Sequence, residues 1–139
     1  MSEIEAKVIQ KYAKVSTPKL IQRATKYFNL FIRNRDLHGD YFQCISCKEV
    51  KSVHQMNAGH YLSAGNNGPV RFNEDNVHGQ CVRCNMHMSG NLLGYREGII
   101  QKIGKERVEA LETKAKMRGF RWDRFALIEI IEIYKQKSK

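Results

Sequence analysis

Acidic residues are scarce in this chain, which has 14 Asp and Glu side chains against 24 Lys and Arg. The resulting formal net charge is +10. It favours a polyanionic partner, most simply a nucleic acid. A basic protein without such a partner is the alternative that the charge alone leaves open.

Long apolar runs are also missing, and no segment approaches the roughly 20 residues that a membrane-spanning helix requires. The longest apolar stretch, from Phe125 to Ile133, is interrupted by Glu129 and Glu132. The first residues lack the basic and apolar segments of a signal peptide. These features predict a cytoplasmic protein that does not associate with a membrane.

The chain has only four cysteines, and all of them fall in two Cys-x-x-Cys pairs, Cys44 with Cys47 and Cys81 with Cys84. In a reducing cytoplasm such pairs favour a metal over disulfides. Zinc takes four tetrahedral thiolates, and a two-residue spacer lets one turn supply two of them. The sequence therefore predicts one structural Zn²⁺ held by four cysteines. A redox-active pair is the weaker alternative.

Apolar spacing predicts helices at both ends of the chain and short strands between them. Thr17-Pro18 is a helix start, and the helical pattern continues to Asp36. Strand-like runs follow, with a hairpin expected between residues 50–56 and 59–62 and a loop at 64–69. Further helices are expected over residues 85–103, 105–117 and 122–137. We predict a flexible segment (1–16), a zinc-bound core with its preceding helix (17–104) and a helical extension (105–139).

Several short motifs surround the cysteine pairs. They are Ala58-Gly59-His60-Tyr61, the run from Arg71-Phe72-Asn73 through Asn76 to Cys84-Asn85, Ser89-Gly90-Asn91, Tyr95-Arg96, and the helix segment 28–36. Together they resemble the phage NinG (Rap) recombination endonuclease family over about residues 18–104. The centre is also similar to HNH nucleases of the ββα-metal type and to phage endonuclease VII, which has an asparagine after its fourth zinc cysteine.

The resemblance implies an α+β fold, with a small treble-clef ββα-metal zinc core flanked by an N-terminal helix and C-terminal helices. It implies a metal-dependent endodeoxyribonuclease that cleaves branched DNA, such as Holliday junctions and D-loops, in phage recombination. A zinc-stabilised accessory protein that binds DNA without cutting is the alternative. A transcription-type zinc finger is a weaker one, because no helix carries an evident set of base-reading side chains.

His60 is the expected general base, because a neutral imidazole can take a proton from water near pH 7. Asn85 is expected to bind a catalytic Mg²⁺ or Mn²⁺ through its amide oxygen, and Asn76 matches the middle asparagine that ties the loop and orients the histidine. Nucleases of this type usually have a metal ligand just before the base, where this chain has Gly59. The candidates to replace that ligand are Asp75 and His78 first, then His54, Asn57 and His60 itself.

Cationic side chains are the expected DNA contacts. Arg71, Arg83 and Arg96 suit phosphate clamps because a guanidinium matches phosphate geometry. The polar face of the first helix adds Lys19, Arg23 and Arg33, while His87 is either a DNA contact or a packing residue. The last helix has more apolar positions than one face needs, which predicts packing on the N-terminal helix or a homodimer. A dimer would suit cutting both strands of a symmetric junction.

Overall fold

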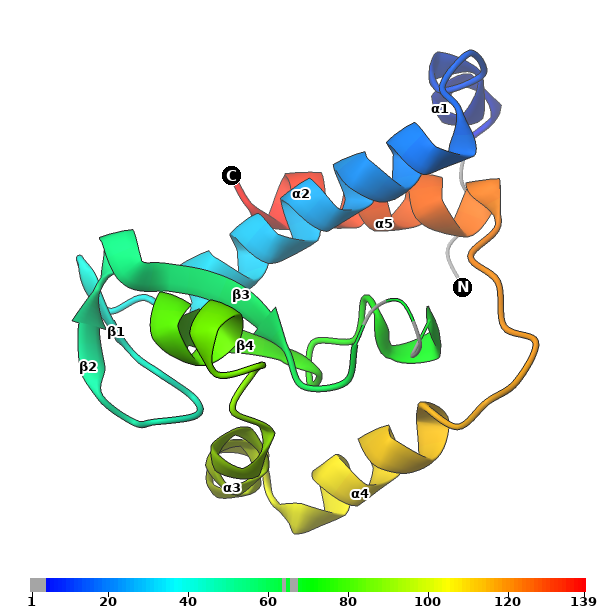
Figure 1. Cartoon of the computed structure of the whole chain (residues 1–139). Helices are drawn as coiled ribbons and strands as arrows, with labels where there is room; N and C mark the ends of the chain where they lie inside the picture. Colours follow the sequence, from blue (N-terminus) through cyan, green and yellow to red (C-terminus); the bar gives the residue numbers. More distant parts are fainter. Residues whose placement is uncertain (1–4, 64, 66–67) are drawn as a thin grey trace. The chain divides into compact units, whose positions relative to one another are not determined.

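The computed structural model describes residues 5–63, 65 and 68–139. Within them the chain forms helices and two short antiparallel sheets, which confirms the predicted α+β class (Figure 1). Two compact units result, one combining the chain up to Phe31 with Arg121–Lys139 and the other comprising Ile32–Phe120, here called the zinc unit. The predicted flexible segment and the loop at 64–69 lie partly outside the described residues, and the segment boundaries at 16 and 104 stay a prediction. No described helix is both long and apolar enough to cross a bilayer.

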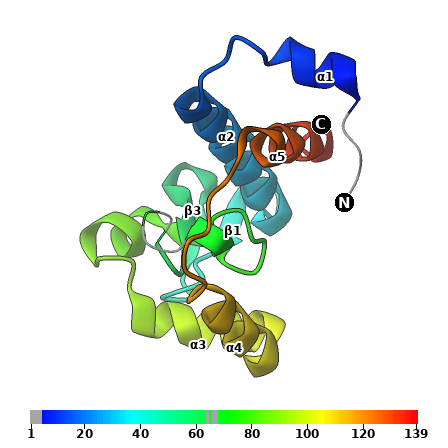
Figure 2. The ribbon, with the colours of Figure 1, turned by 90° about the vertical axis from the view of Figure 1, so that its right-hand side faces the viewer.

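The unit formed by the two ends of the chain consists of helices. They are α1 (Ala6–Lys11), α2 (Thr17–Asp36), of which the part up to Phe31 belongs here, and α5 (Arg124–Lys137). The predicted bounds of α2 are confirmed. Helix α5 lies beside α2 (Figure 2). Between the two helices, the rings of Phe28 and Tyr134 pack edge to face with their centroids 4.8 Å apart. Leu127, Ile128, Ile131 and Tyr134 of α5 are buried within one chain, whereas Phe125 and Ile133 stay exposed, and a homodimer stays a prediction.

The sheets of the zinc unit pair differently from the predicted hairpin. Strand β1 (Tyr41–Gln43) pairs with β2 (Val50–Ser52), and β3 (Met56–His60) pairs with β4 (Val77–Cys81). The first cysteine pair lies in the turn between β1 and β2, where the N–H of Cys44 donates to the carbonyl of Glu49. Because residues 50–52 pair with β1 across this turn, residues 56–60 pair instead with β4, the strand that leads into the second cysteine pair. Met56 consequently lies opposite Cys81.

The helix predicted over residues 85–103 is wrong as one continuous element. A single π-helical turn (Arg83–His87) follows β4, and α3 begins only at Leu92 and ends at Ile103. Ser89, Gly90 and Asn91 lie between them, all with positive φ (49°, 86° and 41°). Three successive left-handed residues cannot belong to a right-handed helix. Helix α4 (Lys105–Lys114) follows directly, separated from α3 by Gly104 at φ 93°.

The zinc unit is held together by a core between α3, α4 and the first cysteine turn. Its buried members are Ile45, Tyr61, Val70, Tyr95, Ile99, Val108 and Leu111. Two glycines of α3, Gly94 and Gly98, face the cysteine turn. A Cβ added to Gly98 would lie 1.8 Å from the carbonyl oxygen of Ile45, and one added to Gly94 would lie 2.4 Å from that of Ser46. The backbone of the turn can reach α3 only because these two side chains are absent.

Replacing Gly98 with alanine is therefore expected to destabilise the zinc unit. The gain in helix propensity, about 1 kcal/mol, is smaller than the cost of pushing α3 off a rigid backbone, about 1–3 kcal/mol or more. Chemical denaturation should show a lower free energy of unfolding for Gly98→Ala. Leu93→Ala, at a position that is 86% exposed on the same helix, is the control and should change stability little. Equal stability of Gly98→Ala and wild type would contradict the close contact.

Candidate functional site

The four cysteines come together as the sequence predicts. Their sulfur atoms all lie within 4.8 Å of one another, and those of Cys47 and Cys81 are 3.9 Å apart. Tetrahedral zinc with bonds of about 2.3 Å places its sulfurs about 3.8 Å apart, so the cluster fits such an ion. Across the described part of the chain, no other group of three or more His, Cys, Asp or Glu side chains gathers in this way.

Nitrogen donors surround the sulfurs. The backbone N–H of Cys81 points to Cys44 Sγ at 3.3 Å, and Asn91 Nδ2 lies 3.4 Å from Cys84 Sγ. N–H groups directed at sulfur stabilise the thiolate form that binds metal. The sequence argument missed this role of Asn91, although the turn composition of Ser89-Gly90-Asn91 marks the break in the chain that places it.

His60 and Asn85 line one open cavity of about 390 Å³ beside the cysteine cluster. His60 ends β3, and Asn85 follows Cys84 in the π-helical turn. The cavity lining also includes Ser63 and Ser89. The fold therefore brings together two of the three predicted catalytic residues, which are 25 positions apart in sequence. We call this cavity the His60–Asn85 pocket.

The hydrogen bonding of His60 determines which ring nitrogen carries the proton. Nε2 lies 3.1 Å from the carbonyl oxygen of Arg71. Because a carbonyl oxygen only accepts, Nε2 is the donor in the neutral ring and Nδ1 keeps its lone pair. Burial lowers the pKa of His60 below its ordinary value of 6.5, an effect that the nearby Arg71 charge reinforces and the hydrogen bond opposes. His60 is thus a neutral imidazole at pH 7 with an available basic nitrogen.

Asn76, the third predicted catalytic residue, is fully buried. Its Oδ1 accepts from the N–H of Leu62 at 2.9 Å, and its Nδ2 donates to the carbonyls of Leu62 and Val70. Both ends of the segment that follows His60 are thus tied to one side chain. Arg71, whose carbonyl orients His60, follows Val70 directly, so Asn76 acts on His60 through the backbone of this segment.

Comparison with known proteins places the chain among phage proteins. The family model described as "Bacteriophage Lambda NinG protein" matches residues 2–139. The chain belongs to the NinG family. "Protein ninG" of Escherichia phage lambda is 41% identical over 119 residues, which make up 86% of this chain and 55% of that protein. The proteins of the same name from Escherichia phage 933W and Salmonella phage P22 are each 40% identical, over 86% of this chain and 56% of their own length.

The chain spans about half the length of these NinG relatives. No solved structure matches it. The NinG assignment bears out the family resemblance seen in the motifs around the cysteine pairs, and it establishes a phage protein. The names of the relatives state no enzymatic activity.

In this NinG protein the Gln80 side chain occupies the space that a side chain at position 59 would need. A Cβ added to Gly59 would lie 2.0 Å from Gln80 Oε1. The Gln80 amide is fixed in this orientation because its Nε2 donates to the carbonyl of Gly90 at 2.6 Å and to Ser46 Oγ at 2.8 Å. Its Oε1 is buried without a hydrogen-bond partner among the described residues. Glycine at position 59 is thus a packing requirement of the sheet.

The Gly59–Gln80 contact predicts a strong coupling between the two positions. Gly59→Ala is expected to cost roughly 1–3 kcal/mol, because it overpacks a buried site. The same substitution in a Gln80→Ala background should cost less, because the opposing side chain is gone. Denaturant unfolding of the four proteins gives the interaction energy as a double-mutant cycle. Additive effects would show that Gln80 does not determine the residue at 59.

The proposed replacements for the ligand missing at Gly59 are engaged elsewhere, and neither Asp75 nor His78 lines the His60–Asn85 pocket. Asp75 pairs with Arg107. His78 Nε2 donates to the carbonyl of Asp75 at 2.8 Å, and its Nδ1 is 2.9 Å from Lys102 Nζ. Burial and then the Lys102 charge lower the pKa of His78 to about 4. His54 and Asn57 also lie outside the pocket lining.

The side chains predicted to contact DNA differ in how far contacts within the chain already occupy them. Arg96 forms two hydrogen bonds to the carboxylate of Glu112, a partner that sequence spacing did not reveal. Arg71 keeps a buried Nε without a partner among the described residues, and its guanidinium lies over the Phe72 ring. The remaining predicted contacts are exposed or half-buried at the surface: Lys19, Arg23, Arg33 and Arg83. His87 is also exposed.

Proposed function

We propose that this NinG-family chain is a metal-dependent endonuclease that cleaves branched DNA, such as Holliday junctions and D-loops, during phage recombination in the host cytoplasm. The observation that carries the proposal is the state of His60, whose Nε2 is tied to a carbonyl and whose basic Nδ1 has no described partner. It lines one pocket with Asn85. An antiparallel strand pair followed by a helical turn, with cysteines at both, supports an HNH-like ββα-metal and treble-clef assignment.

The proposed chemistry assigns one task to each side chain. His60 accepts a proton from the attacking water at Nδ1, and its hydrogen bond to the Arg71 carbonyl keeps the ring in the required tautomer. Asn85 makes no side-chain hydrogen bond within the described chain, so its amide oxygen is available to a hard cation. The terminal N–H groups of Arg71 make no hydrogen bond within the described chain, so they are the donors that this guanidinium would offer to a phosphate oxygen.

The donor set fits a catalytic Mg²⁺ or Mn²⁺. Such ions are often held by only one or two protein oxygens and keep water and substrate phosphates as their other ligands. Asn85 would hold the ion. The bound ion would supply Lewis-acid stabilisation of charge on the scissile phosphate and the leaving oxygen. The four cysteines have a different role, because thiolate ligands prefer zinc to Mg²⁺ or Mn²⁺. A zinc ion there would hold in place the segments that form the pocket.

The charge of the chain supports a nucleic-acid substrate. The helical unit carries a cavity of about 190 Å³ lined by four cationic and two tyrosine side chains: Lys11, Arg23, Lys26, Lys135, Tyr12 and Tyr27. Such a lining suits a phosphate backbone. A zinc-stabilised protein that binds DNA without cutting would share this charge, so only catalysis separates the two functions.

The proposal is tested with a synthetic four-way junction, a D-loop and a linear duplex of the same sequence. The zinc-loaded protein is incubated with each DNA with Mg²⁺, with Mn²⁺ or with no added divalent ion, and the strands are resolved on a denaturing gel. Cuts near the branch point that require the added ion are expected. If the protein binds the branched DNA but leaves every strand intact in both metals, it is the non-catalytic accessory protein.

The lowered pKa of His60 predicts how cleavage depends on pH. Neutral His60 is the active form, and the folded-state pKa lies below 6.5. Cleavage limited by this base should therefore keep more than half of its plateau rate at pH 6.5 and fall further as the pH drops through the lower folded-state pKa. Single-turnover rates between pH 5 and 8 measure this. A rate that already halves on going from pH 7.5 to 6.5 would contradict the assignment.

A further inference from the structure

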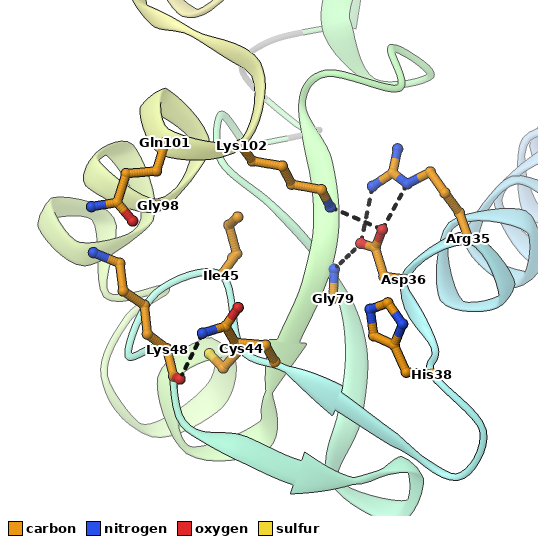
Figure 3. A pocket seen from close by; sticks show the side chains of 11 residues that line it. Arg35, Asp36, His38, Cys44, Ile45, Lys48, Gly79, Gly98, Gln101 and Lys102 are labelled. Atoms are coloured by element: carbon orange, nitrogen blue, oxygen red, sulfur yellow. Dashed lines mark hydrogen bonds and ion pairs between the residues drawn. The ribbon is translucent and has the colours of Figure 1, made fainter.

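We propose that the zinc unit has a second ligand site, a phosphate-binding pocket between the first cysteine turn and the C-terminal half of α3. This cavity has a volume of about 480 Å³ and is separate in its lining from the His60–Asn85 pocket. Its charged lining comprises Arg35, Asp36, Lys48 and Lys102 (Figure 3). We call it the Lys48–Lys102 pocket. Arg35 belongs to the basic face of the first helix that the sequence already marks for phosphate contact, whereas Lys48 and Lys102 were not predicted as DNA contacts.

The one acid in the pocket, Asp36, is fully engaged by the protein. Its Oδ1 accepts from Arg35 Nε at 2.8 Å and from Lys102 Nζ at 2.9 Å, and its Oδ2 accepts from Arg35 Nη2 and the N–H of Gly79. Burial alone would raise the pKa of this carboxyl, but these partners hold it well below its usual range. Asp36 is thus ionised, and four hydrogen bonds occupy its two oxygens.

This saturation argues against a cation as the ligand. A metal ion would need carboxylate lone pairs that are already used, and it would approach three positive side chains. Arg35, Lys48 and Lys102 together outweigh the single charge of Asp36 by two. The excess is positive, so the pocket favours an anion.

Unused donors face the same cavity. Lys48 makes no side-chain hydrogen bond or ion pair within the described chain, and Figure 3 shows its ammonium group beside the amide of Gln101. Lys102 uses two of its three N–H groups on Asp36 and His78, which leaves one. The Lys48 ammonium and the Gln101 amide, which lie together on one side of the cavity, can both donate to the oxygens of one phosphate, while Lys102 lies across the cavity beside Asp36 and adds its positive charge.

The position of Lys48 is itself fixed. It stands directly after Cys47, in the left-handed region at φ 65°, and its N–H donates to the carbonyl of Cys44. The cysteine turn therefore presents this lysine, while Asp36 and His78 hold Lys102 in place. The backbone of Lys48 and the side chain of Lys102 are thus held in place before a ligand binds, which lowers the conformational cost of binding.

The two pockets lie along one helix. Leu92, at the first residue of α3, lines the His60–Asn85 pocket, and Lys102, near its end, lines the second. Ten residues of helix span about 15 Å. If the proposed function holds, the second pocket takes a backbone phosphate of the same DNA, a few nucleotides from the cut. The phosphate site itself does not depend on cleavage.

The test measures binding and not cutting. Fluorescence anisotropy of a labelled four-way junction, without Mg²⁺ or Mn²⁺, gives the affinity of the zinc-loaded protein over a range of salt concentrations. Lys48→Gln is expected to weaken binding several-fold and to lower the slope of log affinity against log salt by about 1, the value for one lost phosphate contact. Lys114→Gln removes the same charge at an exposed position outside the pocket and should leave the slope unchanged.

A second arm identifies the source of the phosphate. Inorganic phosphate and a nucleoside monophosphate are titrated into wild type and Lys48→Gln, and the amide shifts of Lys48, Gln101 and Lys102 are followed by NMR. Saturable shifts in wild type only, with an unchanged salt slope for DNA, would assign the pocket to a small phosphate. An unchanged slope together with no saturable shift overturns the proposal. Gln101→Glu, which adds a negative charge to the pocket, should abolish the saturable shifts and should weaken junction binding at least as much as Lys48→Gln does.

Discussion

Removing the metal from the four-cysteine site is expected to unfold the zinc unit. The cluster joins the turn between β1 and β2 to the end of β4, and without an ion four buried or half-buried sulfurs would be left with only each other and a few N–H groups. Structural zinc sites contribute on the order of 10 kcal/mol to folding. That is comparable to the whole stability of a small domain. Circular dichroism during chelator titration, with released zinc measured in parallel, should show loss of structure and of metal together.

Substitution separates this effect from general sensitivity to chelators. Cys81→Ser should prevent stoichiometric zinc binding and give a zinc unit without cooperative unfolding. Ser2→Ala, far outside the cysteine cluster in sequence, serves as a neutral handling control. Retention of a cooperative transition at the wild-type temperature, in protein shown to be metal-free, would mean that the surrounding core alone maintains this fold.

Replacing His60 with alanine should reduce junction cleavage by roughly 10²–10⁴-fold, the usual contribution of a general base. The ring accepts a proton in the proposed reaction and has no described contact at Nδ1, so DNA binding should change little. Single-turnover cleavage and anisotropy on the same junction measure the two quantities separately. His54→Ala is the matched control, because His54 is exposed and lies outside the lining of the His60–Asn85 pocket.

Two results would count against this role. Cleavage by His60→Ala at the wild-type rate would remove His60 from the mechanism. A parallel loss of cleavage and of thermal stability would show that the bond to the Arg71 carbonyl is mainly structural. His60→Gln, whose side-chain amide reaches the position of Nε2 and can still donate to the Arg71 carbonyl, distinguishes these cases by keeping the structural hydrogen bond without a base of suitable pKa.

Local chemistry made part of this structure predictable. Thr17-Pro18 determines where α2 begins, and the two-residue spacer within each cysteine pair predicts that the pair supplies two metal ligands, because both signals depend on residues near each other in the chain. The motif resemblance placed His60 and Asn85 together, and they do share a pocket. Residue spacing was enough to predict the structure where a single turn or helix determines the geometry.

Contacts between distant segments account for what could not be predicted. Strand pairing required knowing that the cysteine turn takes residues 50–52 for β1. The filling of Gly59's place by Gln80, 21 positions away, follows from that pairing. Lys102 reaches Asp36 and His78 across the fold, and neither spacing nor composition signals such a three-way contact.

The contact between α3 and the first cysteine turn has a consequence for how this family can vary. Gly94 and Gly98 meet carbonyl oxygens, which every amino acid carries. The carbonyl contacts make no demand on the side chain at position 46, and at position 45 they require only an apolar side chain that fits the core against α3, whereas they exclude every side chain at 94 and 98. We therefore expect family sequences to differ on one side of this contact only. The cysteine turn can exchange residues, subject to its other contacts, while α3 keeps Gly94 and Gly98.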